Sequence, residues 1–119
     1  MHKPIVGIVS NSHLINDQFW IYGSSRMNVE AIIGAADAIP IIIPAFPGKI
    51  DLDEIVARCD GFLLTGGRTN VHPEEYSQVP TETHGEFDRD RDGISLGLIR
   101  RCIKLGQPIL GICRGFQEF

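Results

Sequence analysis

The sequence predicts an α/β fold in which a parallel β-sheet is covered by helices on both faces. Two observations support this class. Short runs of apolar, largely β-branched residues alternate along the chain with segments of helical periodicity. Each run is apolar throughout instead of alternating with polar residues, which is typical of strands buried on both faces. No repeat or linker divides the 119 residues, so we predict one domain over residues 1–119.

Four segments fit the buried strands of this sheet. Each is followed by polar residues, a proline or a glycine-rich turn, where a strand would end. The predicted strands are residues 4–10, 39–43, 61–64 and 107–112. Because helical segments separate them, we expect these strands to be parallel neighbours joined by crossovers.

Three segments fit helices. One apolar face at helical spacing is formed by Val29, Ile32, Ile33 and Ala36. Asp51 or Asp53 can cap a second helix that ends near Cys59. The strongest pattern covers residues 88–105, with acidic residues in its first turns and Gly106 placed to terminate it.

Two further segments, residues 11–26 and 68–87, have no sustained period and are predicted to be loops. The second is long for a loop inside a compact domain. Loops of that length usually carry function. We therefore expect residues 68–87 to contribute to a functional site.

Composition excludes several classes of function. The chain is 43% hydrophobic and 22% charged, with a net charge of −4 and no basic face for nucleic acid. Its longest apolar stretch, residues 38–46, is too short and too proline-rich to span a membrane. The 3 cysteines lack metal spacing and cannot form a closed disulfide framework. With no leader sequence recognised, we expect a reduced, cytoplasmic protein without metal or cofactor.

The last predicted strand runs directly into Gly111-Ile112-Cys113-Arg114-Gly115. A nucleophile between two glycines at a strand–helix junction is the pattern of a nucleophile elbow. The glycines let the backbone fold back tightly on both sides of the nucleophile. A helix that starts after Cys113 would direct amides at the sulfur and favour the thiolate. Most free cysteines are small buried residues, but this context indicates a catalytic nucleophile.

Gly66-Gly67 follows another predicted strand and should lie at the same sheet edge as Cys113. Acyl transfer needs two hydrogen-bond donors for the developing oxyanion. The amide of Arg114 and one amide of the Gly66-Gly67 loop would supply them. A glycine pair alone is equally compatible with a plain turn.

Three segments around these residues are similar to the signature sequences of the peptidase C26 group, within the class I glutamine amidotransferase-like superfamily. The similar segments are residues 65–73 with Tyr76 after them, Asp88-x-x-Arg91-Asp92, and residues 108–118. Within that group the chain most resembles enzymes of the γ-glutamyl-γ-aminobutyrate hydrolase type. The resemblance covers nearly the whole chain, and the Cys-Arg-Gly-Phe-Gln run is its distinctive piece.

The resemblance implies a flavodoxin-like three-layer sandwich, here truncated after the nucleophile elbow as the N-terminal part of the domain. It also implies a hydrolase that cleaves γ-glutamyl amide bonds through a cysteine nucleophile and a thioester, a reaction of polyamine catabolism. Cys113 would be the nucleophile, and the amides of Gly67 and Arg114 the oxyanion donors. Gly66, Asn70 and His72 would contact the small-molecule substrate.

The family's catalytic His and Glu would lie downstream of this chain. None of its four histidines, His2, His13, His72 and His84, ends a predicted strand, so none is a natural substitute for the base. Two alternatives to a γ-glutamyl hydrolase therefore stay open. The chain could be a non-catalytic fragment or half of a split enzyme, or it could be a glutaminase subunit of an amidotransferase. A homo-oligomer or a complementing C-terminal half are the expected protein partners.

Other residues have less specific interpretations. Cys59 and Cys102 lie on apolar helix faces and are predicted to be core residues. Arg91 and Asp92 match the family motif but could simply form an ion pair at the helix start. Phe19 and Trp20 could line the substrate pocket, although aromatic side chains more often cover the core. His72 is expected to be an exposed loop residue.

Overall fold

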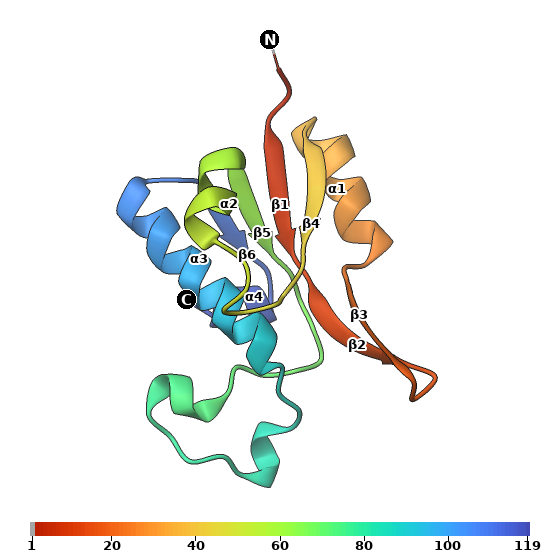
Figure 1. The fold of residues 1–119 in the computed structure, drawn as a ribbon, viewed down its shortest axis with the longest axis vertical. Coiled ribbons are helices and arrows are strands. Elements are labelled where there is room, and N and C mark those ends of the chain that lie inside the picture. Colours follow the sequence, from red (N-terminus) through yellow and green to blue (C-terminus); the bar gives the residue numbers. More distant parts are fainter. Residues whose placement is uncertain (1) are drawn as a thin grey trace.

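The computed structural model describes residues 2–119, in which a four-stranded parallel sheet has helices on both sides (Figure 1). In chain order this part of the fold comprises β1 (Ile5–Val9), α1 (Arg26–Ala36), β4 (Ile39–Ile43), α2 (Leu52–Arg58), β5 (Gly61–Leu64), α3 (Arg89–Leu105), β6 (Ile109–Gly111) and α4 (Arg114–Gln117). Two further strands and two 3-10 helices are β2 (Asn11–Ile15), β3 (Phe19–Gly23), η1 (Pro73–Tyr76) and η2 (Glu82–His84).

The strand order of the sheet is β4-β1-β5-β6, and every neighbouring pair is parallel. The predicted parallel pairing of the four strands is therefore confirmed. At the carboxyl ends of β5 and β6, Leu64 lies opposite Gly111. The segments that follow these two strands consequently leave the sheet at the same edge, which is where open α/β sheets bind ligands.

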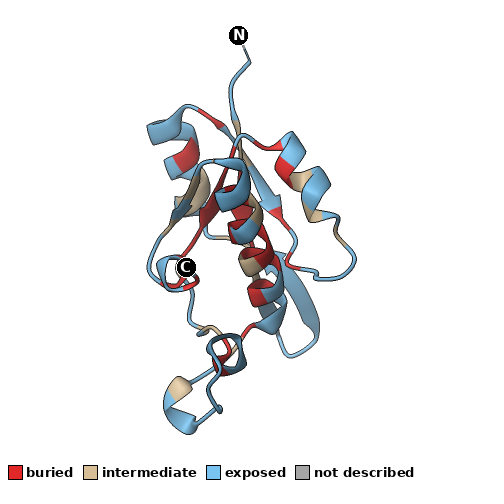
Figure 2. Cartoon of the chain, turned by 90° about the vertical axis from the view of Figure 1, so that its left-hand side faces the viewer, coloured by how far each residue is buried: buried red, intermediate tan, exposed pale blue. Residues whose placement is uncertain are grey.

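The sheet is the middle of three layers, because its side chains alternate between two covered faces. On one face, Phe62 and Leu64 pack with Leu98 of α3 in the larger core cluster. On the other face, Ile8 packs with Ile32 of α1. Figure 2 shows the buried stripe along α3 where this helix meets the sheet. The predicted three-layer, flavodoxin-like α/β fold is confirmed.

Helix ends follow from local side-chain and backbone chemistry. Asp51, and not Asp53, caps α2, because its carboxylate accepts hydrogen bonds at 3.1 and 3.2 Å from the amides two and three residues on. Asp88 caps α3 by accepting from the amide of Arg91 at 3.0 Å. Gly106 ends α3 at φ 68°, a left-handed conformation that glycine adopts without strain. The helix-ending role predicted for Gly106 is confirmed.

The prediction of a loop over residues 11–26 is wrong, because most of this segment is an antiparallel β-hairpin. The amide of Gln18 donates to the carbonyl of Ile15 at 3.0 Å, and the intervening Asn16 and Asp17 have φ values of 51° and 53°. Two left-handed residues form the type I′ turn, which matches the twist of paired strands. The aromatic residues that follow the turn favour a strand. In Figure 1 the hairpin projects away from the sheet.

Backbone contacts join the two ends of the long segment between β5 and α3. The amide of Asn70 donates to the carbonyl of Glu86 at 2.7 Å, and Asn70 forms a β-bridge with Phe87. The two 3-10 helices lie between these anchor points. Its outgoing and returning ends are thus joined beside the sheet edge, and only the middle of the segment projects.

The turn after β6 packs against β5 more closely than any side chain would permit. A Cβ atom on Gly115 would lie 2.0 Å from the carbonyl oxygen of Leu64, and one on Gly111 would lie 2.6 Å from the carbonyl oxygen of Gly115. Contacts below 3.0 Å against backbone cannot be relieved by a rotamer change. Both flanking glycines are therefore required for α4 to sit against the sheet.

We predict that Gly115→Ala destabilises the fold strongly, because the new methyl group would overlap the backbone of β5. Gly34→Ala is the matched control, since a Cβ atom there meets nothing within 4 Å. It should leave stability unchanged or raise it by roughly 0.5–1 kcal/mol, as alanine favours helix. Urea denaturation of the two variants measures both effects. Equal stability of the two variants would contradict the close packing of the turn.

Candidate active site

Cys113 occupies the turn between β6 and α4 in a conformation that non-glycine residues rarely adopt. Its φ is 54° and its ψ is −110°, which costs on the order of 1–3 kcal/mol. The residue is exposed, unlike the other two cysteines. Such strain persists only where the surrounding structure enforces it, here through the two flanking glycines. The turn therefore presents the Cys113 thiol above the carboxyl edge of the sheet.

Gly66 lies beside the cysteine at this edge. A Cβ atom built on Gly66 would be 3.7 Å from the Cβ atom of Cys113. Gly66 and Gly67 directly follow Thr65 at the end of β5, so two neighbouring strands deliver the glycine pair and the cysteine to one place. The structure thus brings together the two sequence features that were predicted to share a sheet edge.

The peptide that joins Gly66 to Gly67 is held from its carbonyl side. The Gly66 oxygen accepts from the Thr65 hydroxyl at 3.1 Å and from the Asn11 amide group and the Arg91 guanidinium, both at 3.5 Å. In a trans peptide the N–H points opposite to the carbonyl. Holding the carbonyl therefore turns the Gly67 N–H away from Asn11 and Arg91. Within residues 2–119 neither this N–H nor that of Arg114 donates to an acceptor.

The side chain of Arg114 ties the same loop to the elbow. Its Nε donates to the carbonyl and hydroxyl oxygens of Thr69 at 2.8 and 3.1 Å. Its Nη2 donates to the carbonyl oxygen of Asn70 at 3.3 Å. Arg114 is almost completely buried. One residue thus places a free backbone amide next to Cys113 and fixes the loop that carries Gly67.

Arg91, Asp92, Arg114 and Glu118 form a buried charge network beneath the site. Glu118 accepts from Arg91 at 2.7 Å and from Arg114 at 2.8 Å, and Asp92 accepts from Arg114 at 2.8 Å. No side chain of the four is more than 1% exposed. The expected ion pair between Arg91 and Asp92 is therefore wrong, because each pairs with a residue of the α4 segment instead. Sequence reasoning missed Glu118, the C-cap residue of α4, whose spacing of four residues from Arg114 was the available signal.

His72 is buried, so the expectation of an exposed loop residue is wrong. Its backbone amide donates to Asp92 at 2.9 Å, and its Nδ1 accepts from the amide of Glu74 at 3.2 Å. The ring packs on Phe87, with centroids 4.6 Å apart. Nδ1 is thereby engaged in capping η1, and within residues 2–119 no histidine hydrogen-bonds to Cys113.

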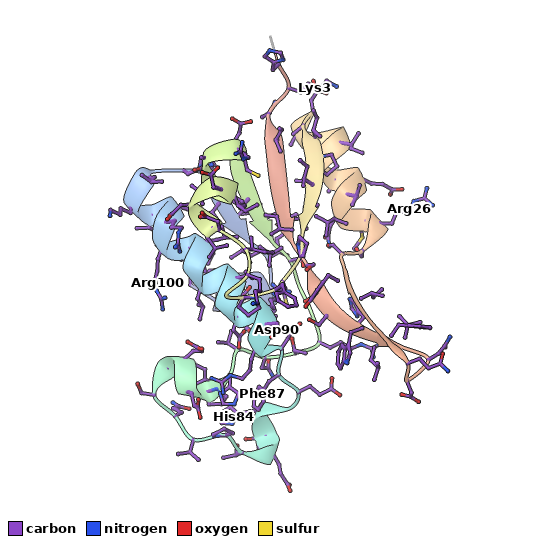
Figure 3. All side chains as sticks on the ribbon, viewed as in Figure 1. Lys3, Arg26, His84, Phe87, Asp90 and Arg100 are labelled. Carbon is purple, nitrogen blue, oxygen red and sulfur yellow. The ribbon has the colours of Figure 1, made fainter. Side chains whose placement is uncertain are left out.

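Asn70 lies at the base of the loop, where it forms the β-bridge with Phe87. Its side-chain amide donates to the carbonyl oxygen of His84, which places it against the 84–87 segment. Figure 3 shows His84 and Phe87 close together below α3, with Asp90 at the start of that helix. The structure brings Gly66 next to Cys113, whereas the Asn70 and His72 side chains contact other parts of the loop.

Phe19 and Trp20 do not cover the core, since 61% and 70% of their surfaces are exposed. Trp20 instead lines an open cleft of about 1150 Å³ between the hairpin and the segment that enters α3. This hairpin cleft is lined by Asn11, Ser12, His13, Leu14, Trp20, Tyr22, Arg68, Thr69 and residues 85–90. Cys113 is outside the lining, but Arg68 directly follows Gly67.

Cys59 and Cys102 are buried, as predicted for core residues. Burial raises the pKa of the Cys102 thiol. Burial also raises the pKa of Cys59, with a smaller contribution from the neighbouring Asp60 charge. Both thiols are therefore less ionised near neutral pH than an ordinary cysteine.

Residues 2–119 contain neither a metal-binding cluster nor a membrane-spanning helix. No cluster of three or more His, Cys, Asp or Glu side chains is arranged to hold a metal ion. None of the helices in this range has the length and apolar character needed to cross a membrane.

A parallel α/β sheet that ends in a strained, glycine-flanked cysteine turn is the architecture that the sequence predicted for the glutamine amidotransferase-like class. The model of the Peptidase C26 family matches residues 4–119, and the chain belongs to this family. A glutamine amidotransferase-like protein of Rickettsia prowazekii is 31% identical over 97% of this chain and 42% of its own length. A γ-glutamyl-γ-aminobutyrate hydrolase of Escherichia coli O157:H7 is 30% identical over 99% of this chain and 45% of its own length. The chain thus spans less than half the length of these relatives.

We predict that Glu118→Ala lowers the free energy of unfolding by about 3–5 kcal/mol, because two buried guanidinium groups lose their shared carboxylate. The matched control is Glu54→Ala, which removes the exposed partner of Arg58 and should cost less than about 1 kcal/mol. Urea denaturation gives both values. A loss for Glu118→Ala as small as that for the control would contradict a structural role of the network.

We predict that Cys113 is alkylated before Cys59 and Cys102 in the folded protein near neutral pH. The reason is that Cys113 is exposed, whereas burial both shields the other thiols and raises their pKa. Raising the pH toward those raised pKa values should narrow the selectivity. Iodoacetamide competition with peptide mass mapping checks this, with urea-unfolded protein as the control. Preferential labelling of either buried cysteine in folded protein would remove the elbow assignment.

Proposed function

We propose that this chain carries the nucleophile half of a hydrolase that cleaves γ-glutamyl amides through a thioester. The observation that supports this most directly is the strained Cys113 turn with Gly66 against it. Cys113 is the proposed nucleophile, and the amides of Gly67 and Arg114 are the proposed oxyanion donors. Gly66, Asn70 and His72 are proposed to shape the substrate side of the loop.

In the proposed reaction the Cys113 thiolate attacks the γ-carbonyl carbon, and the negative charge moves to the carbonyl oxygen. The two free amides would stabilise that oxyanion. Collapse of the intermediate breaks the carbon–nitrogen bond and releases the amine, which takes up a proton. Water then cleaves the thioester and releases glutamate. No metal or cofactor is needed for these steps.

The proton for the amine and the activation of water need a general acid–base group. Because no histidine within residues 2–119 hydrogen-bonds to Cys113, we propose that this group comes from a downstream His and Glu. The relatives are more than twice as long as the part matched here, which leaves room for such residues. A longer natural chain, a complementing half or a second copy could each supply them.

A glutaminase subunit is the second candidate. It is favoured by the glutamine amidotransferase-like relative in Rickettsia prowazekii. Glutamine is itself a γ-glutamyl amide, so both candidates share the nucleophile and differ only in the amine released. A role in polyamine breakdown in the cytoplasm would follow from the hydrolase and not from the glutaminase.

We predict that the 119-residue chain becomes acylated but does not turn over. With the γ-p-nitrophenyl ester of glutamate, whose nitrophenolate leaving group needs no proton, a γ-glutamyl adduct should form on the Cys113 peptide. Steady-state hydrolysis should be about four orders of magnitude below that of a full-length relative, since triad members act as a unit. Mass spectrometry and nitrophenolate release measure the two steps. Cys113→Ala is the control and should form no adduct.

Two results would contradict this proposal. Absence of any adduct on Cys113, with the fold intact, would remove its role as nucleophile. Robust turnover by the chain alone that is abolished by Cys113→Ala would instead show that the base lies within it.

A further inference from the structure

We infer that the hairpin cleft is the subsite for the leaving amine and that it selects amines whose apolar chain ends in a cation. This inference rests on the proposed function and adds the class of substrate to it. It starts from the cavity and its lining, neither of which the proposed chemistry at Cys113 uses.

The cleft has one wall built by a single face of the hairpin. Leu14 pairs with Trp20 and Ser12 pairs with Tyr22, and residues paired across an antiparallel ladder share a face. All four line the cleft. This wall presents two aromatic rings and one aliphatic side chain, which suits the hydrocarbon part of a ligand.

The two walls of the cleft, the hairpin and the segment that enters α3, are joined at their base by hydrogen bonds. The carboxylate of Asp88 accepts from the amide and the hydroxyl of Ser12 at 2.9 and 3.3 Å, and it also accepts from the amide of Arg91. The Tyr22 ring meets the Phe46 ring edge to face, with their centroids 6.3 Å apart. The hairpin is thus fixed to the start of α3 through Ser12 and to the loop after β4 through Tyr22.

The cleft adjoins the proposed oxyanion loop. A Cβ atom on Gly67 would lie 2.9 Å from the Asn11 side-chain oxygen, and Asn11 lines the cleft. Arg68 and Thr69, which follow Gly67, line it as well. A substrate bound at the Gly67 amide would reach the cleft past Arg68 and Thr69.

The charges of the lining favour a cationic end. Asp88 is occupied by Ser12 and the α3 cap, and Arg89 pairs with Glu74 at 3.0 Å. Within residues 2–119, the lining carboxylates Glu86 and Asp90 form no salt bridge.

The pKa of Tyr22 is also affected by the negative charges of the cleft. Loss of hydration raises the pKa of its phenol, and the charges of Asp90 and Asp88 raise it further. Two carboxylates thus act on the aromatic wall. A cation placed against the faces of Trp20 and Tyr22 would be attracted by the rings and by Asp90. Among the described residues Arg68 forms no salt bridge, and it follows Gly67 directly, at the proposed oxyanion loop.

Binding can be measured without catalysis, because Trp20 is the one tryptophan in the sequence. The chain with Cys113→Ala is titrated with γ-glutamyl amides of 1,4-diaminobutane, butylamine and 4-aminobutyrate, and tryptophan fluorescence is recorded. These probes share a four-carbon chain and end in a cation, a methyl group and a carboxylate. The cationic probe should quench Trp20 saturably and bind about fivefold more tightly than the neutral one. The anionic probe should bind most weakly.

Asp90→Asn should reduce the preference for the cationic probe over the neutral one to less than about twofold. Asp17→Asn is the matched control, since it removes the same charge from the hairpin turn, outside the cleft, and asparagine tolerates the left-handed conformation there. It should leave the preference unchanged. Equal or tighter binding of the anionic probe, or an unchanged preference in Asp90→Asn, would overturn the inference.

Failure of the inference can be separated from failure of the proposed function. If no probe changes Trp20 fluorescence while wild-type Cys113 still forms the γ-glutamyl adduct, the cleft is not the amine subsite and the nucleophile assignment stands. If the cationic probe binds but Cys113 forms no adduct, the cleft binds amines and the proposed hydrolysis is wrong.

Discussion

The buried charge network is the interaction on which the rest of the candidate site depends. Arg114 and Glu118 extend it into the turn after β6, while Arg91 and Asp92 bring it from the first turns of α3. Through Thr65, Thr69 and Asn70 it also holds the backbone of the loop after β5. Three segments distant in sequence are therefore fixed by one set of ion pairs. Charges buried this completely are costly unless each is paired and hydrogen-bonded, so the loss of one member leaves its partners uncompensated.

The conformation of Cys113 therefore depends on the packing of the surrounding fold. The strain at Cys113 is maintained because Gly111 and Gly115 permit close packing on β5 and because Arg114 and Glu118 anchor the following turn. The Nε atom of Arg91 is buried without a partner among the described residues, so even this dense network leaves one donor unsatisfied. The terminal nitrogens of Arg91 donate to the loop, for example to the carbonyl oxygen of Thr65, while its Nε atom has no acceptor within reach among residues 2–119.

The sequence was sufficient to predict the sheet, since each strand is an uninterrupted apolar run and each helix shows an apolar face. The glycine pattern around Cys113 was equally informative, because only glycine permits the observed approach to Leu64. Prediction failed where long-range contacts decide. No local sequence pattern indicates that Arg91 pairs with Glu118 or that Phe87 packs on the His72 ring. The pairing of the 11–26 segment with itself was missed for a different reason. The Asn16-Asp17 pair was the available hairpin signal, but it lacks the glycine that usually marks such turns.

The hairpin has a consequence for how such proteins diversify. It is tied to the body through residues at its base, such as Ser12, while its tip at Asn16 and Asp17 makes a turn of its own in solvent. A ribbon anchored in this way can change in length or in aromatic content without disturbing the hydrogen bonds of the main sheet. Variation among homologues is therefore expected to concentrate in the β2–β3 ribbon, because this appendage can be exchanged without altering the turn that holds Cys113.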